Sequence, residues 1–142
     1  MKTLLAILLT ALLISFNVVQ AQDLSPQPQT VNGVTFVSGG VGNREKEEML
    51  SMKKEYNLHL LFVDKGTGAY MSGIRVKILD AKGTTILDSI SNGPFFYAQL
   101  NPGKYRITAS VYDQEQTQPT VISAKKTVSK TFYFKAQKAP AE

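Results

Sequence analysis

The sequence has no cysteine, no tryptophan and a single histidine among its 142 residues. The absence of cysteine excludes a disulfide-stapled fold, thiolate nucleophiles and thiolate metal sites. A single imidazole also excludes the multi-histidine ligand sets that are typical of catalytic zinc. We therefore predict that the chain is not an enzyme, with no catalytic residues, no metal site and no cofactor.

Long apolar runs are also scarce, and the exception lies at the N-terminus. Lys2 precedes an apolar stretch at residues 4–14, and Val19-Gln20-Ala21 has the pattern of a signal-peptidase site. The stretch is shorter than the about 20 apolar residues that a membrane-spanning helix needs. We predict a secretory signal peptide at residues 1–21 and no stable membrane insertion after its cleavage. The chain is then exported, and we favour the periplasm over full secretion.

The formal net charge is +5. Basic residues are spread along the chain and are adjacent only at Lys53-Lys54 and Lys125-Lys126. A nucleic-acid-binding protein would group them on one stripe or face, so we predict no nucleic-acid partner. We interpret the positive charge as a solvated surface that keeps the chain soluble, and the alternative is a weak attraction to anionic lipid headgroups or to acidic polysaccharide.

Two polar segments and one short helix are expected outside the strands. Residues 22–43 are predicted to be a flexible leader because their N-terminal half is rich in proline and glutamine, although residues 34–37 could form a short strand. Residues 136–142 are predicted to be a flexible tail. Apolar residues at three- and four-residue spacing predict a helix at residues 44–56, with Asn43 as its N-cap. Because this helix is short, it must dock on another element to persist.

Alternating hydrophobicity begins after Tyr56 and predicts seven strands. They lie at residues 57–63, 74–78, 84–91, 95–100, 104–112, 118–123 and 127–135. Turn residues separate them, which is typical of an antiparallel sandwich or barrel. The strand at 57–63 is apolar on both faces, so we expect the helix to dock there.

The strand region also resembles a known family. The matching residues are Val76, Ile78, Asp80 and Gly83 in one hairpin, Asn92 to Phe95, and Leu100, Pro102, Gly103, Tyr105 and Ile107 around a turn. This pattern resembles the carboxypeptidase regulatory-like domain of small secreted bacterial proteins, a transthyretin-like, immunoglobulin-like β-sandwich. The resemblance implies an all-β, seven-stranded antiparallel sandwich at residues 57–135 with one short N-terminal helix.

The resemblance implies an accessory module and no reaction. Hydrolases among the transthyretin-like proteins depend on several histidines, an arginine and a C-terminal Tyr-Arg-Gly-Ser motif. This chain has only His59, and its last strand ends at Phe134-Lys135 without that motif. We interpret His59 as an ordinary strand residue.

Strand alternation groups three polar loops at one end of the sandwich. Loops 65–69, 91–94 and 113–118 carry amides near aromatic rings, a combination that suits sugar or peptide contact. The candidate contact residues are Tyr70, Asn92, Tyr112, Gln114 and Gln116. The alternative is that these loops are polar for solubility alone. We interpret Asp64, Asp80, Asp88 and Asp113 as turn or capping residues and not as calcium ligands.

These observations favour a non-catalytic, exported interaction module that binds an unknown protein or an envelope polysaccharide. Open strand edges are one recognised route to such binding. The alternative is a small-ligand or carbohydrate-binding protein that uses the three loops. The sequence leaves the oligomeric state open.

Overall fold

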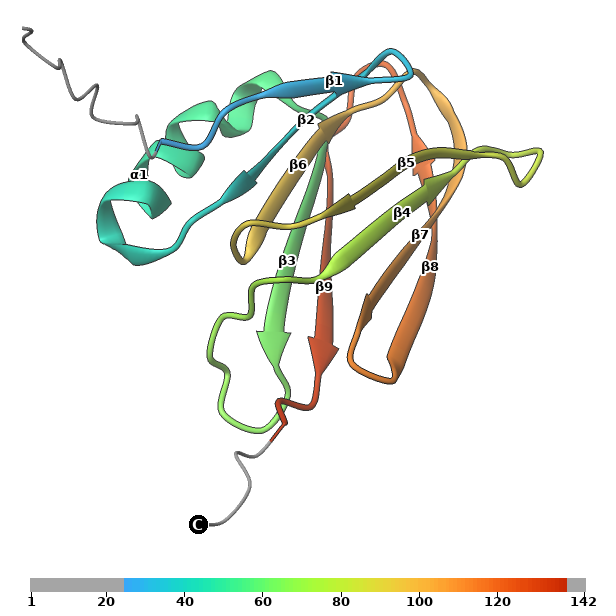
Figure 1. The fold of residues 1–142 in the computed structure, drawn as a ribbon. Helices are drawn as coiled ribbons and strands as arrows, with labels where there is room; N and C mark the ends of the chain where they lie inside the picture. The colour runs from blue at the N-terminus through green and yellow to red at the C-terminus, as the bar shows by residue number, and fades with distance from the viewer. Residues whose placement is uncertain (1–24, 138–142) are drawn as a thin grey trace, which may run out of the picture.

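The computed structural model describes residues 25–137, so the predicted signal peptide and most of the predicted tail lie outside the described residues. Two β-sheets pack face to face (Figure 1). The five-stranded sheet has the order β1 (Gln29–Val31), β2 (Val34–Gly39), β6 (Phe95–Gln99), β3 (Leu58–Asp64) and β9 (Val128–Phe134). The four-stranded sheet has the order β5 (Thr85–Ile90), β4 (Arg75–Leu79), β7 (Gly103–Val111) and β8 (Gln114–Ile122). The seven predicted strands are confirmed as β3 to β9.

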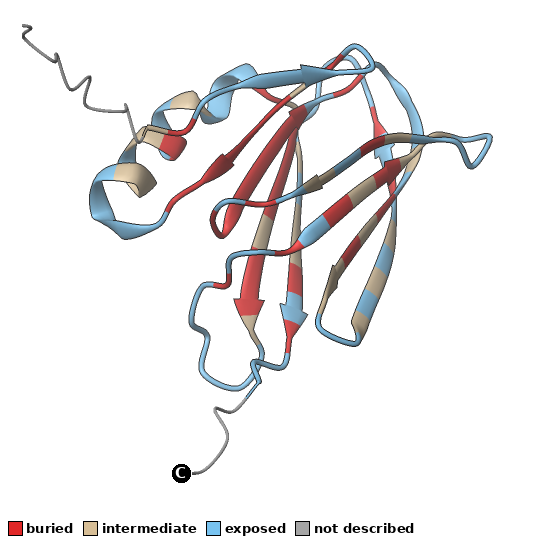
Figure 2. Ribbon diagram, in the orientation of Figure 1, coloured by how far each residue is buried: buried red, intermediate tan, exposed pale blue. Residues whose placement is uncertain are grey.

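The core fills the space between the two sheets. Alternate residues of β4 and β7, such as Val76, Ile78 and Ile107, point inward because side chains alternate between the faces of a strand. They meet the inward residues of β3 and the rings of Phe96 and Phe132, all fully buried. Figure 2 shows buried residues in the strands of both sheets, alternating with more exposed residues along β4. Apolar packing without disulfides therefore holds the sandwich together.

A second, smaller cluster lies on the outer face of the five-stranded sheet, as predicted from the doubly apolar strand β3. Helix α1 (Gly42–Met52) and the 3₁₀ helix η1 (Lys53–Glu55) cover this face. The cluster consists of Val37, Met49, Tyr56, Phe95 and Tyr97. An isolated helix of this length would be marginal in water, so docking of Met49 and Tyr56 keeps it folded.

The predicted flexible leader is wrong in part. Residues 29–31 and 34–39 form the hairpin β1–β2, and β2 pairs with β6. Pro26 is also buried and packs beside Gly39. Sequence composition missed β1 because a three-residue edge strand with exposed side chains has no hydrophobic pattern.

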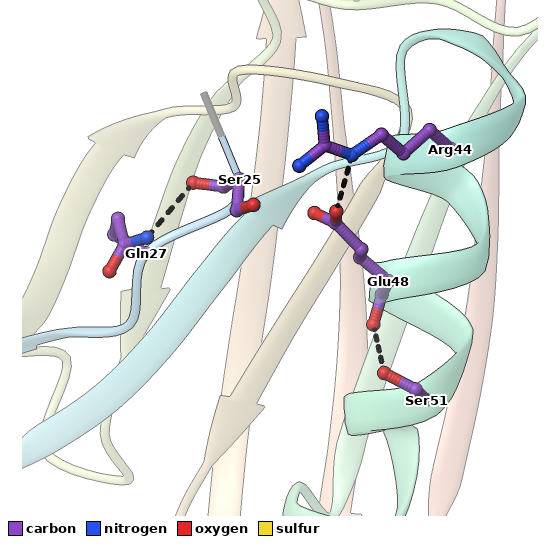
Figure 3. A network of polar contacts seen from close by, with 5 residues as sticks. All are labelled: Ser25, Gln27, Arg44, Glu48 and Ser51. Carbon is purple, nitrogen blue, oxygen red and sulfur yellow. Dashed lines mark hydrogen bonds and ion pairs between the residues drawn. The ribbon is translucent and has the colours of Figure 1, made fainter. Parts of the chain in front are cut away.

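The start of the helix also differs from the prediction. The N-cap is Val41, which makes no side-chain capping bond, and Asn43 lies inside α1. Instead, the backbone N–H of Gly40 donates to Glu45 Oε1 at 2.8 Å, so a side chain of the first turns reaches back to the preceding loop. On the exposed side of α1, Arg44 pairs with Glu48 at 3.0 Å, and the Ser51 hydroxyl donates to the Glu48 carbonyl (Figure 3).

The sandwich is not wholly antiparallel. Strand β9 pairs in parallel with β3 along its whole length, from Leu58 opposite Val128 to Asp64 opposite Phe134. The chain crosses from the four-stranded sheet to the other sheet between β8 and β9, and β9 then runs in the same direction as β3. Within residues 25–137, no helix is both long and apolar enough to cross a bilayer.

Candidate functional site

Tyr70 follows the loop at residues 65–69 and is half exposed on the helix side of the molecule. Its ring meets Phe95 edge-on, with 5.5 Å between the ring centroids. Lys46 Nζ of α1 lies 5.2 Å from the centroid of the same ring. Tyr70 therefore helps to fix α1 against the start of β6, besides presenting part of its ring to solvent.

Asn92 lies in the turn between β5 and β6, beside strand β2. Its backbone N–H donates to the Ser38 hydroxyl at 2.9 Å. The next residue, Gly93, presses directly on the backbone of Gly39, where a Cβ would come within 2.2 Å of a carbonyl carbon. This turn is therefore a packing contact between β2 and the start of β6, and Asn92 is its one exposed residue among residues 91–94.

Gln114 and Gln116 have structural partners. Gln116 donates to the Tyr133 carbonyl, and Gln118 donates to the Thr131 carbonyl. Gln114 donates to the Lys135 carbonyl at 2.7 Å and accepts from the Lys135 N–H at 2.9 Å. These three glutamines of β8 bond to the backbone at the outer edge of β9, and we call them the glutamine ladder. They join the two sheets and occupy an edge that could otherwise accept a foreign strand.

The five candidate contact residues do not form one site. Tyr112 is exposed at the β7–β8 turn with a positive φ of 55°. It lies in the same hairpin as Gln114 and Gln116, whereas Tyr70 contacts Lys46 of α1 and Asn92 bonds to Ser38 of β2. The predicted loop at residues 113–118 is wrong, because strand β8 already begins at Gln114. Loop 65–69 and the start of β8 do meet the same strand end, since the Lys65 N–H donates to the Phe134 carbonyl at 2.8 Å and Gln114 donates to the Lys135 carbonyl.

Three of the four aspartates shape local structure. Asp64 accepts from the Thr67 hydroxyl and the Gly66 N–H, and these bonds hold its pKa below the ordinary value. Asp80 accepts from two N–H groups of the β4–β5 turn. Asp88 pairs with the Arg75 guanidinium through two bonds of 2.9 and 2.8 Å. In the described part of the chain, no three histidine, aspartate or glutamate side chains are placed to hold a metal ion.

The opposite end of the sandwich gathers basic side chains that are far apart in the sequence. Pairing registers place the end of β4, the start of β7, the end of β8 and the starts of β3 and β9 at this end. Its exposed basic residues are Lys53, Lys54, Lys82, Lys104, Arg106, Lys125 and Lys126, and its acidic residues are Glu55 and Asp80. We call this set the basic end. The alternating direction of successive strands, which grouped the three polar loops at the other end, could have identified the basic end from the sequence.

A recess opens beside the basic end, between η1 and β9. A cavity of about 130 Å³ is lined by His59, Tyr97, Leu61, Phe95 and residues of β9, and Lys53 borders it. A shallower hollow of about 440 Å³ adjoins it, because Lys53, His59 and Ser129 border both. His59 pairs with Tyr97 on one side and with Ser129 on the other, so the three side chains lie on the same face of the sheet.

The His59 ring is oriented by backbone carbonyls. Nε2 lies 2.9 Å from the carbonyl oxygens of both Lys53 and Tyr56, at the C-terminal end of the helix. Carbonyls only accept hydrogen bonds, so Nε2 carries the proton and Nδ1 of the neutral ring is an acceptor. Burial lowers the pKa of His59, which favours that neutral form.

Two buried polar atoms in the lining residues have no hydrogen-bond partner in the described part of the chain. They are His59 Nδ1 and the Tyr97 hydroxyl, on rings whose centroids are 4.8 Å apart. Burial raises the pKa of Tyr97, so its hydroxyl keeps its proton. Sequence reasoning dismissed His59 because an imidazole alone in the sequence gives no sign of what its neighbours on other strands are.

Comparisons with known proteins found no matching family and some distant structural likenesses. No protein-family model and no curated protein matches the chain. Among solved structures, the chain is similar to the 5-hydroxyisourate hydrolase of Klebsiella pneumoniae, with 20% identity, a TM-score of 0.45, and coverage of 55% of this chain and 88% of the hydrolase. It is also similar to the TIE protein of Bacillus anthracis, with 17% identity and a TM-score of 0.46, over 57% of this chain but only 16% of that protein. Because both TM-scores are below 0.5, these likenesses carry no argument about the fold family or the activity of the chain, and the sandwich rests on the two sheets described above.

Proposed function

We propose that this chain is an exported, non-catalytic interaction module that binds an acidic polysaccharide of the cell envelope through the basic end. The observation that carries the proposal is the gathering of seven basic side chains from four separate segments at one end of the sandwich. An anionic polymer can contact several of them at once, and their summed field attracts it from a distance. The two acidic residues at this end offset only part of that charge.

The surface of the basic end is also hollowed. A depression of about 400 Å³ on the outer face of the four-stranded sheet is lined by Lys104, Arg106 and Val121, together with the β4–β5 turn. Val121 is 65% exposed between the basic side chains. Apolar area between cations suits the C–H faces of sugar rings while the cations neutralise carboxylates.

Export and family rest on the sequence. The predicted signal peptide at residues 1–21 supports an exported chain, with the periplasm as the proposed compartment. The motif around Leu100 and Tyr105 supports a carboxypeptidase regulatory-like domain, whose relatives serve as accessory modules. The assignment of an accessory role agrees with the structural uses of Gln114, Asp64 and Asp80 described above.

Retention on immobilised polygalacturonate, compared with neutral dextran, tests the proposal. We expect the wild-type protein to bind the acidic polymer and to pass through dextran. The K82E/K104E/K125E variant should lose binding, because three cations of the basic end become anions. The matched control is K65E/K135E at the other end, which should bind like the wild type. Equal loss in both variants, or no binding by the wild type, would contradict the proposal.

A second candidate function is small-ligand binding at the end that carries loop 65–69. One observation favours it: a hollow of about 540 Å³ lies between that loop and Lys135 to Gln137. Gln114 and Gln116 bond to the carbonyls of Lys135 and Tyr133 at the same strand end. Chemical-shift changes confined to residues 64–67 and 135–137 on addition of neutral sugars would support this alternative.

A further inference from the structure

We propose that the recess between η1 and β9 binds a hydroxylated carboxylate, as found in one sugar-acid residue of an acidic polysaccharide. The inference deepens the proposed function and takes its ligand class from it. His59, Tyr97 and Ser129 form the floor of the recess, and Lys53 and Lys54 stand at its rim.

The floor holds polar atoms that folding alone does not require. A buried hydroxyl or imidazole nitrogen without a partner destabilises the folded state, whereas an apolar side chain of the same shape would not. His59 is 7% exposed and Tyr97 is 1% exposed, and each has one unpartnered polar atom. Such atoms are exceptions in native proteins, and a binding role accounts for both here.

The two atoms have complementary hydrogen-bonding roles. The carbonyls of Lys53 and Tyr56 both accept from Nε2, so the proton of the neutral His59 ring is on Nε2 and Nδ1 is an acceptor. The Tyr97 hydroxyl can donate, because it keeps its proton. Both rings line the cavity but the two atoms are closed to solvent, so a small rotation of the rings accompanies binding. A ligand hydroxyl both donates and accepts, so sugar hydroxyls that enter the cavity can then satisfy both atoms. The hydroxyls of Ser129 and Thr131 on β9 extend the polar lining.

The rim supplies charge and apolar surface. Lys53 and Lys54 border the larger hollow, and Lys53 lies close enough to His59 for its charge to contribute to the lowered pKa of the imidazole. Both lysines are exposed, which allows their ammonium groups to reach a carboxylate outside the cavity. Leu50, which is 46% exposed, borders the same hollow and can contact the C–H face of a sugar ring.

The first measurement is an NMR titration of the wild-type protein with D-glucuronate, D-glucose and propionate. Glucuronate carries hydroxyls and a carboxylate, glucose carries hydroxyls alone, and propionate carries a carboxylate alone. We expect glucuronate to shift the amide signals of residues 53–61 and 127–131, with an affinity at least tenfold above that of either control probe. No shift with glucuronate at about 10 mM, where even millimolar binding would register, would overturn the inference.

The decisive variant is Y97F, which removes the unpartnered hydroxyl and keeps the ring. We expect it to weaken glucuronate binding about tenfold while the free energy of unfolding stays equal or rises. The K53Q/K54Q variant should reduce glucuronate affinity to that of glucose. Y133F on the exposed part of β9 is the matched control and should change neither quantity. A Y97F protein that binds glucuronate as tightly as the wild type would contradict the inference.

The two proposals fail in different ways. If polygalacturonate binds through the basic end but glucuronate leaves the recess signals unchanged, this inference is wrong and the proposed function stands. If glucuronate binds in the recess and Y97F weakens it, but the polymer is not retained, the proposed function is wrong and the recess is a site for a small hydroxy acid.

Discussion

His59 joins the helix to the sheet through a single ring nitrogen. Nε2 meets two carbonyls at the end of the helix, while Nδ1 has no partner among the described residues. Protonation of Nδ1 would place a charge in a buried site. The residue therefore couples the docking of η1 to the protonation state of one imidazole.

This arrangement predicts a pH dependence of stability. Burial, the largest cause, lowers the pKa of His59 below its ordinary value of 6.5. The unfolded chain then binds the proton more tightly than the folded protein, so the free energy of unfolding should fall as the pH drops below about 6.5. Urea unfolding at about pH 7.5 and pH 5.5 measures the effect, because carboxylates titrate mostly below that window. The H59Q variant should show a smaller difference between the two pH values, and an equal difference would contradict the assignment.

Gly93 packs so closely against the backbone of Gly39 that no side chain fits between them. A Cβ at this position would lie 2.2 to 2.7 Å from backbone atoms of Gly39. Backbone atoms cannot move away by a rotamer change, as the end of a side chain could. We expect G93A to lower the free energy of unfolding by about 1–3 kcal/mol, as overpacking does. G66A is the matched control, because its Cβ would meet only Asp64 Oδ1 at 3.6 Å, and thermal unfolding compares the two variants. If G93A and G66A unfolded at the same temperature, the prediction would be wrong, and β2 and the turn before β6 could move apart without loss of stability.

At the scale of elements, the two sheets are joined along one side by the glutamine ladder. Its three side chains bond to the backbone of residues 131, 133 and 135 at the edge of β9. Strand edges with free N–H and C=O groups invite pairing with other chains. The ladder therefore protects β9 by side chains instead of by another strand.

Removal of the ladder should loosen this edge. In Q114A, the Lys135 N–H loses its acceptor, so its hydrogen exchange should accelerate. The triple variant Q114A/Q116A/Q118A should lower the free energy of unfolding by about 0.5–1.5 kcal/mol for each bond lost. It should also self-associate more than the wild type in sedimentation measurements. E115A on the same strand is the control, and a triple variant that behaves like E115A would show that the ladder is not structural.

At the scale of the whole molecule, local pattern predicted most elements but not how distant segments meet. Alternation found β3 to β9 because their buried faces repeat every second residue, as in Val76 and Ile78. It missed β1, whose side chains are exposed, and it could not show that β9 pairs in parallel with β3. The N-cap at Val41 was missed because the capping contact comes from Glu45.

The candidate sites divide in the same way. The sequence identified Gln114 and Gln116 as candidate ligand contacts. Only the packing of β8 against β9 shows that their side-chain amides already bond to backbone carbonyls of residues 135 and 133. The basic end could have been predicted from the sequence, because the alternating direction of successive strands decides which loops lie together. The recess was not, because the pairing of His59 with Tyr97 and Ser129 joins three separate strands.

The distribution of charge over the whole molecule predicts a salt-dependent affinity. The basic end acts through several exposed cations, and salt shortens the range of such interactions from about 10 Å at 0.1 M to about 3 Å at 1 M. We expect the affinity for polygalacturonate to fall steeply between about 0.05 and 0.5 M NaCl, as measured by biolayer interferometry. The K82E/K104E/K125E variant should show a much flatter dependence, whereas K65E/K135E should keep the wild-type slope. Affinity that is independent of salt in the wild type would show that apolar contacts, such as those of Val121, and not the gathered cations, hold the polymer.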